Sequence, residues 1–240
     1  MFKRIAEAAD LVKALQPLVA ETKGPEIVVC PPFTALVATA VVAHETNIAV
    51  GGQNCYPKDS GAFTGEIAPQ MLIDAGCTWV IIGHSERRQL FGEQDALLNE
   101  KLRYALSVGL SVMFCIGETL QEREGGQMNA VLERQVVEGL KGLVETDFDR
   151  VAIAYEPVWA IGTGVTATPE QAEEAHVFVR GLVAAAHGAA VAEKVRIQYG
   201  GSVKPDNAAE LIAKPNVDGF LVGGASLQAA SFAAIVNACA

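Results

Sequence analysis

The sequence predicts an α/β fold in which parallel strands alternate with helices along the chain. Seven short apolar segments are separated by eight segments with helical spacing, and the chain begins with a helix. Strict alternation favours either a (β/α)8 barrel or a doubly wound sheet. Seven strands behind a leading helix match a (β/α)8 barrel that lacks its first strand, and the doubly wound sheet remains the alternative. No linker or change in composition divides residues 1–240, so we expect a single domain.

The expected strands are short and mainly apolar, and residues 151–155 form a continuous apolar run that is typical of a parallel strand buried on both faces. Half of the residues are apolar but only 6% are aromatic, so Ala, Val, Ile and Leu must supply most of the core. The run at residues 151–155 ends before Pro157, because proline has no N–H to donate to a sheet ladder. The strands are expected at residues 27–30, 48–52, 79–83, 111–116, 151–155, 195–199 and 217–222.

The expected helices carry apolar residues at intervals of three and four positions. In the first helix Ala8, Leu11 and Leu15 share one face. Thr34 is expected to cap the second helix, and Thr168-Pro169 is a typical helix start. The helices are expected at residues 2–19, 35–44, 67–75, 94–108, 128–144, 169–186 and 205–212, and after residue 226.

Glu156 directly follows one of these strands and precedes a long loop of low polarity. Loops of about ten residues without regular structure are usually functional or disordered. Trp159 can provide apolar cover, while Gly162 and Gly164 can absorb the backbone rotations of a hinge. A lid that excludes water would raise the pKa of a carboxylate beneath it toward that of a useful general base. The alternative is that Glu156 only forms a cap or an ion pair and the loop is merely long.

His84 also follows a strand, at the start of a helical turn whose dipole disfavours an imidazolium. A neutral imidazole there can donate a hydrogen bond to a carbonyl oxygen, although a structural role is the more common one for a single histidine. Two glycine pairs, at residues 199–202 and 222–225, follow the last two strands. Each alone could be a tight turn. Together they favour a phosphate site, which (β/α)8 barrels often have at these two strand ends.

Composition excludes several other classes of function. The net charge of −10 argues against nucleic acid as a partner, because phosphate backbones need a basic surface. The five cysteines are an odd number without a C-x-x-C pair, so we expect reduced thiols in a cytoplasmic protein, with neither a disulfide framework nor a zinc site. No apolar stretch approaches the roughly 20 residues that would span a membrane.

Three motifs together resemble the signatures of the triosephosphate isomerase family. They are GHSERR at residues 83–88, YEPVWAIGTG at 155–164 and YGGSV at 199–203, and the resemblance runs from Phe2 to the C-terminus. It implies a TIM barrel that interconverts dihydroxyacetone phosphate and D-glyceraldehyde 3-phosphate through an enediolate, in glycolysis and gluconeogenesis, without cofactor or metal. It also implies a homodimer in which residues 55–65 insert into the partner.

The roles of the site residues follow from the same resemblance. Glu156 would move the proton, His84 would polarise the substrate oxygens, and Tyr199 would hold the closed lid. The phosphate would be bound by Gly162, Ser202, Gly223 and Gly224.

The sequence departs from the family pattern at its start. In the family, a first strand carries an asparagine and a lysine that contact the substrate, and it ends just before a segment similar to Met1–Lys3. This strand is absent from the sequence. Neither Lys3, Lys58 nor Lys204 matches the missing lysine by position. Two hypotheses follow: a working isomerase whose natural chain extends upstream, or an inactive, truncated barrel that binds phosphate weakly or serves only as a folded module. Without that strand we expect the 240 residues to be poorly stable and essentially inactive.

Overall fold

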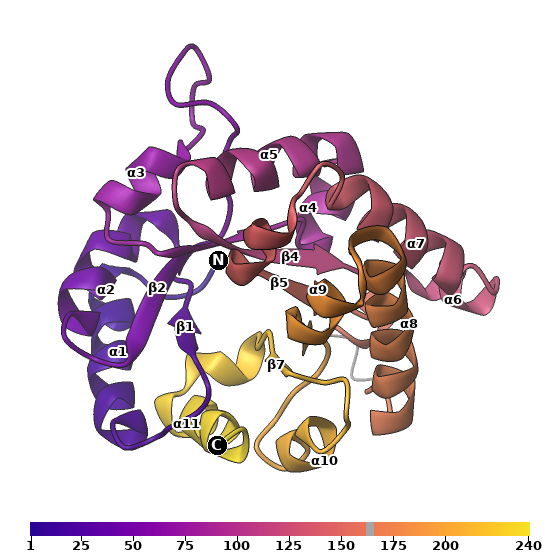
Figure 1. Cartoon of the computed structure of the whole chain (residues 1–240). Coiled ribbons are helices and arrows are strands. Elements are labelled where there is room, and N and C mark those ends of the chain that lie inside the picture. The colour runs from indigo at the N-terminus through magenta and orange to yellow at the C-terminus, as the bar shows by residue number, and fades with distance from the viewer. Residues whose placement is uncertain (162–165) are drawn as a thin grey trace.

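In the computed structural model, seven strands form one curled parallel sheet with helices around its outside (Figure 1). The structure describes residues 1–161 and 166–240. The strands are β1 (Ile27–Val29), β2 (Ile48–Gly52), β3 (Trp79–Ile82), β4 (Ser111–Ile116), β5 (Val151–Tyr155), β6 (Arg196–Tyr199) and β7 (Gly219–Phe220). They lie in chain order and every pair is parallel. This order has no reversal point, so the doubly wound alternative is wrong.

The helices connect successive strands and pack against the outer face of the sheet. In the described residues they are α1 (Ile5–Val19), α2 (Leu36–Ala43), α3 (Pro69–Asp74), α4 (Ser85–Leu90), α5 (Asp95–Ser107), α6 (Leu120–Glu124), α7 (Met128–Gly139), α8 (Pro169–His187), α9 (Ala189–Lys194), α10 (Ala208–Ile212) and α11 (Ala229–Ala238). Within those same residues no helix is long and apolar enough to cross a membrane.

On the strands β1 to β5, alternate residues point into two different cores. On β3, Val80 and Ile82 join the large core between the sheet and its helices. Trp79 and Ile81 belong to a smaller cluster with Met113 of β4, on the inner face of the curl. Both faces of this part of the sheet are therefore covered, which explains why β1 to β5 are largely continuous apolar runs.

The two ends of the curled sheet are β1 and β7, and no strand pairing joins them in the described part of the chain. Glu26 instead links β1 to a distant strand. Its carboxylate accepts hydrogen bonds from Arg196 at the start of β6 (2.7 Å) and from the indole N–H of Trp79 (2.8 Å). The Arg196 guanidinium also lies over the Trp79 ring, 5.3 Å from its centroid. This cluster links the beginnings of β1, β3 and β6, none of which pairs with another in the sheet.

Several local expectations differ from the structure. Thr34 does not cap α2, because it lies inside a 3-10 turn, Phe33–Ala35, that precedes the helix. The short helices α6 and α9 have five and six residues, too few for a helical repeat to be visible in the sequence. β7 has only two residues where six were expected, and β6 is its only neighbour in the described residues.

Part of the segment between β2 and α3 extends away from the body of the molecule, and residues 58–66 within the segment are all exposed (Figure 1). Within it Phe63 is 38% exposed and packs against Tyr56 with ring centroids 4.6 Å apart. Gly61 and Gly65 both adopt positive φ angles, which side chains rarely allow. The segment is therefore an ordered arm with an apolar side chain near its tip.

Candidate active site

His84 and Glu156 meet at the carboxyl ends of the strands. Glu156 follows β5 directly and His84 lies two residues beyond β3, on either side of β4. His84 Nε2 is 3.0 Å from Glu156 Oε1. The Glu156 side chain is only 2% exposed, whereas the His84 side chain is 28% exposed. The pair thus combines a buried carboxylate with an imidazole that a ligand can reach.

The backbone around His84 determines which ring nitrogen carries the proton. Gly83 turns the chain out of β3 with a φ of +81°, and His84 then occupies the N-cap position of α4. Nδ1 accepts a hydrogen bond from the main-chain N–H of Glu86 (3.2 Å). Nδ1 is therefore unprotonated, and the neutral ring carries its proton on Nε2, which faces Glu156.

Ser85 holds the carboxylate of Glu156. Its main-chain N–H donates to Oε2 (2.9 Å) and its hydroxyl donates to Oε1 (3.3 Å). Burial raises the pKa of Glu156 above the usual value, while His84, Ser85 and the thiol of Cys115 act in the opposite direction. Burial is the largest of these effects, so the carboxylate is a stronger base than an exposed glutamate.

Glu156 lies in a slot between two glycines. Its N–H donates to the Ile116 carbonyl at the end of β4 (2.7 Å), and a Cβ on Gly117 would lie 1.7 Å from the Glu156 carbonyl oxygen. On the other side, a Cβ on Gly200 would lie 2.9 Å from Cγ of Glu156. The neighbouring strands can approach this closely only where a residue has no side chain.

Glu118 anchors the chain on both sides of Glu156. This buried carboxylate accepts hydrogen bonds from the Tyr155 hydroxyl (3.0 Å), the Trp159 indole (2.9 Å) and the Arg123 guanidinium (3.0 Å). Burial raises the pKa of Tyr155, so its hydroxyl remains a donor. Glu118 follows the expected strand at residues 111–116, but the sequence analysis gave it no role. Nothing in its position along the sequence indicates these three partners.

The sequence analysis also gave no role to Arg88. It donates to the carbonyls of Gly83 (2.9 Å) and Cys115 (3.0 Å) and pairs with Asp95 (2.5 Å), so it joins the ends of β3 and β4 next to His84. Its place in the motif 83–88 was the only available signal.

Three of the residues expected to bind phosphate, Ser202, Gly223 and Gly224, follow β6 and β7, two neighbouring strands. The Ser202 hydroxyl donates to the carbonyl of Ala160 (2.9 Å), in the loop after Glu156. Gly223 and Gly224 are exposed at the start of a 3-10 helix, Gly224–Leu227. Gly162 lies outside the described residues, as does most of the expected hinge.

Tyr199 ends β6 and is fully buried. Burial raises the pKa of its hydroxyl to about 12, and the main-chain amide of Ala167 lowers it. The hydroxyl therefore lies near the segment that leads from residues 162–165 into α8. This position is compatible with the expected contact to a closed lid.

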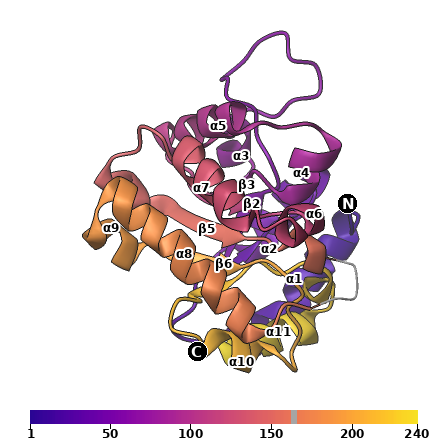
Figure 2. The ribbon, with the colours of Figure 1, turned by 90° about the vertical axis from the view of Figure 1, so that its right-hand side faces the viewer.

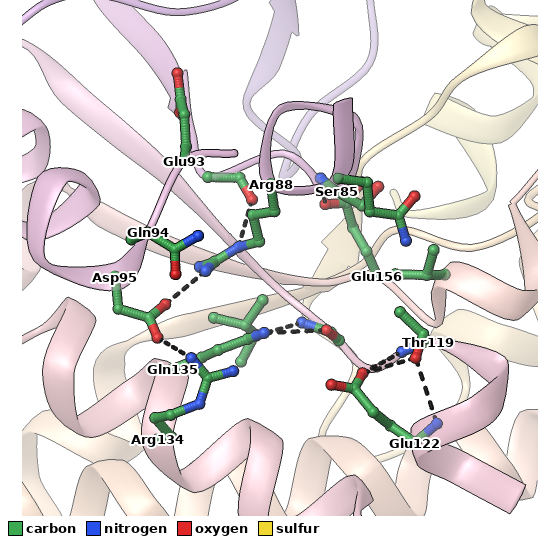
Figure 3. Close-up of a pocket in the computed structure, with 15 residues that line it drawn as sticks. Ser85, Arg88, Glu93, Gln94, Asp95, Thr119, Glu122, Arg134, Gln135 and Glu156 are labelled. Atoms are coloured by element: carbon green, nitrogen blue, oxygen red, sulfur yellow. Dashed lines mark hydrogen bonds and ion pairs between the residues drawn. The ribbon is translucent and has the colours of Figure 1, made fainter. Parts of the chain in front are cut away.

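A polar pocket of about 180 Å³ approaches Glu156 from the side of α5 and α7 (Figure 3). Its lining includes Ser85, Arg88, Asp95, Gln135 and Glu156, and it contains neither His84 nor Ser202. Among the described residues no group of three or more His, Cys, Asp or Glu side chains could hold a metal ion. All five cysteines are free thiols.

The site face carries α4 and α6 and lies on the right-hand side of Figure 2. The amino-terminal end of the chain lies on the same side in that view (Figure 2).

Comparison with known proteins places this geometry in context. The family model described as "Triosephosphate isomerase" matches residues 1–239. The triosephosphate isomerase of Pelobacter propionicus is 53% identical over 237 residues, which cover 99% of this chain and 94% of that protein. Those of Geobacter metallireducens and Chloroflexus aurantiacus are 54% and 52% identical over the same number of residues, covering 94% and 95% of those proteins.

Proposed function

The chain belongs to the triosephosphate isomerase family, and we propose that it interconverts dihydroxyacetone phosphate and D-glyceraldehyde 3-phosphate through an enediolate. The observation that carries this proposal is the 3.0 Å contact between a buried glutamate after β5 and a histidine after β3, at the carboxyl ends of the strands. None of the observations above favours a non-catalytic, truncated barrel instead.

In the proposed reaction, Glu156 abstracts a proton from one carbon of the substrate and returns it to the next. Its raised pKa suits this task, because a base poised nearer to neutral pH accepts and releases a proton readily. In the structure the Glu156 carboxylate accepts a hydrogen bond from Ser85 and contacts His84 Nε2, so it must leave these partners to reach a substrate carbon.

His84 is proposed to stabilise the charge that develops on the substrate oxygens. Its Nε2–H is already fixed as a donor, because Nδ1 accepts from Glu86. When the carboxylate of Glu156 moves to the substrate carbon, this N–H becomes available to an oxygen. A donor fixed before the reaction begins stabilises the developing oxyanion without further reorganisation.

The phosphate is proposed to bind main-chain N–H groups of Gly162, Gly223 and Gly224 and the hydroxyl of Ser202. With a net charge of −10, the protein must bind an anion through local donors of this kind. The segment after Glu156 is proposed to close over the substrate and to be held by Tyr199. No cofactor or metal takes part in this mechanism.

We also propose that an eighth strand between β7 and β1 completes a single-domain (β/α)8 barrel and supplies the family's asparagine and lysine. The support is the lack of pairing between β1 and β7 in the described residues, since barrel closure links strand number, tilt and stagger. The test compares the 240-residue chain with one extended at its amino terminus by such a strand. Equal turnover and equal melting temperature would contradict the proposal.

The protein is further proposed to act as a cytoplasmic homodimer without a nucleic acid or membrane partner. The arm that contains the exposed residues 58–66 supports this, because it extends away from the body and Phe63 within it is exposed. Light scattering of the purified chain should show a dimer, and a Phe63→Glu variant should shift it toward monomer. A fully active monomer would rule out the arm as a necessary contact.

The activity itself is tested, in a chain that includes the first strand, with a coupled assay that measures formation of D-glyceraldehyde 3-phosphate from dihydroxyacetone phosphate. His84→Gln should lower kcat far more than it raises KM, because Nε2–H acts on the transition state. His44→Gln, a change of the same kind at an exposed position after α2, is the matched control. An unchanged kcat in His84→Gln would remove His84 from the mechanism.

A further inference from the structure

Gln135, on the inner side of α7, binds both main-chain groups of a single residue beside the active site. Its Oε1 accepts from the N–H of Gly117 (2.7 Å), and its Nε2 donates to the carbonyl of Gly117 (3.2 Å; Figure 3). The side chain is 5% exposed and both hydrogen bonds are buried. A carboxamide is the one type of side chain that offers a donor and an acceptor in this planar arrangement.

Gly117 in turn lies directly against the main chain of Glu156. An added Cβ would be 1.7 Å from the Glu156 carbonyl oxygen and 2.7 Å from its carbonyl carbon. The preceding residue, Ile116, accepts the N–H of Glu156 (2.7 Å). A shift of Gly117 toward β5 would therefore displace Glu156, and Gly200 closes the slot on the other side.

We propose that Gln135 is a positioning residue for Glu156: by clamping Gly117 it sets the main-chain position of the glutamate and hence the reach of its carboxylate. The kinetic part of this inference rests on the proposed isomerase function. The structural part rests only on the contacts from Gln135 through Gly117 to Glu156.

The clamp has a measurable consequence at the carboxylate. Glu156 Oε2 is held by the N–H of Ser85 at 2.9 Å, a contact that depends on where the main chain of Glu156 lies. This hydrogen bond lowers the pKa of Glu156, opposing the effect of burial. When the clamp is lost and Glu156 shifts, we expect a longer bond to Ser85 and a further rise in the pKa of Glu156.

The central experiment compares Gln135→Met with Gln16→Met. Gln16, on α1, is a matched control because its Nε2 also donates to a main-chain carbonyl, that of Val42 (2.6 Å), at a partly buried position. Gln135→Met should lower kcat by about tenfold or more, since misplacement of a reacting group by about 1 Å can cost a hundredfold. KM should stay within about threefold of the wild type, because three of the four proposed phosphate contacts, Ser202, Gly223 and Gly224, follow β6 and β7. Gln16→Met should change neither.

A second measurement does not require turnover. In protein labelled with ¹³C at the glutamate carboxyl carbons, the Glu156 resonance is assigned by its absence in Glu156→Gln and followed against pH. Its midpoint should rise in Gln135→Met and stay unchanged in Gln16→Met. Gln135→Glu, which keeps an acceptor for the Gly117 N–H but loses the donor, should show a smaller kinetic effect than Gln135→Met.

The outcomes separate the two hypotheses. Equal kcat and equal Glu156 midpoints in Gln135→Met and Gln16→Met would overturn the positioning role. A wild-type chain that includes the first strand and shows no turnover would overturn the proposed function, and the titration alone would then decide the role of Gln135. If Gln135→Met does not fold, Gln135→Glu is tested against the same control by the same two readouts.

Discussion

Shortening Glu156 by one methylene is the most direct test of its role as the base. In Glu156→Asp the carboxylate retreats by about 1.5 Å, the length of one C–C bond. The present contacts with His84 (3.0 Å) and the Ser85 N–H (2.9 Å) show that the carboxylate is held within hydrogen-bond distance of its partners. The aspartate would therefore fall short of both partners, and of a substrate carbon that glutamate can reach.

The expected loss can be estimated from that distance. Proton transfer needs the reacting atoms about 3–3.5 Å apart, and a misplacement of about 1 Å can cost about a hundredfold in rate. We therefore expect kcat to fall by at least about 10²-fold, which corresponds to about 3 kcal/mol of transition-state stabilisation. KM should change by less than about threefold, because the proposed phosphate contacts are untouched.

The assay is steady-state turnover of both triose phosphates, with Glu174→Asp as the matched control. Glu174 is an exposed residue on α8, so this variant should retain wild-type kcat and KM. Thermal melts of both variants separate a loss of fold from a loss of chemistry. A near-wild-type kcat for a folded Glu156→Asp would refute the assignment of Glu156 as base.

Two further predictions concern stability. Burial lowers the pKa of His176 to about 4, so the stability that comes from its neutral form is present above the usual pKa of 6.5 and is lost as pH falls toward 4. Chemical denaturation at a series of pH values should show a loss of roughly 3 kcal/mol in the free energy of unfolding, and His176→Gln should reduce this loss. Equal pH dependence of unfolding in wild type and His176→Gln would contradict this. Glu26→Ala should lower the free energy of unfolding by about 1–2 kcal/mol, because the buried indole N–H of Trp79 loses its acceptor. Glu26→Gln keeps an acceptor for this N–H and should lower the free energy of unfolding by less.

The sequence was sufficient for the parts of the fold that depend on local patterns. Continuous apolar runs located the strands β1 to β5, because both faces of that part of the sheet are covered; β6 instead alternates polar and apolar residues. The meeting of His84 and Glu156 could be expected from the sequence for a related reason. The carboxyl ends of parallel strands lie at one edge, so residues that follow β3 and β5 must be near each other.

The supporting residues could not be found in this way. Gln135 and Gly117 are 18 positions apart on different elements, and the contact between Gly117 and Glu156 exists only because β4 and β5 are neighbours. Glu118 likewise binds Tyr155 and Trp159 across about forty positions of sequence. The number of strands in the closed barrel, the dimer, the phosphate contacts and the lid remain predictions, the last because residues 162–165 lie outside the described part of the chain.

The burial that makes Glu156 a better base must also reduce the stability of the fold at higher pH. Its pKa is raised in the folded protein, so between the usual value for glutamate and the raised value the folded state binds more protons than the unfolded state. The free energy of unfolding therefore falls as pH rises through that window. In Glu156→Gln this group no longer titrates, so the difference in unfolding free energy, wild type minus variant, should decrease with rising pH there and level off above it. Denaturant titrations of both proteins at a series of pH values measure this difference. A difference that stays flat or increases through the window would show that the hydrogen bonds from Ser85 and the contact with His84 outweigh burial, and that Glu156 is not a base activated by its surroundings.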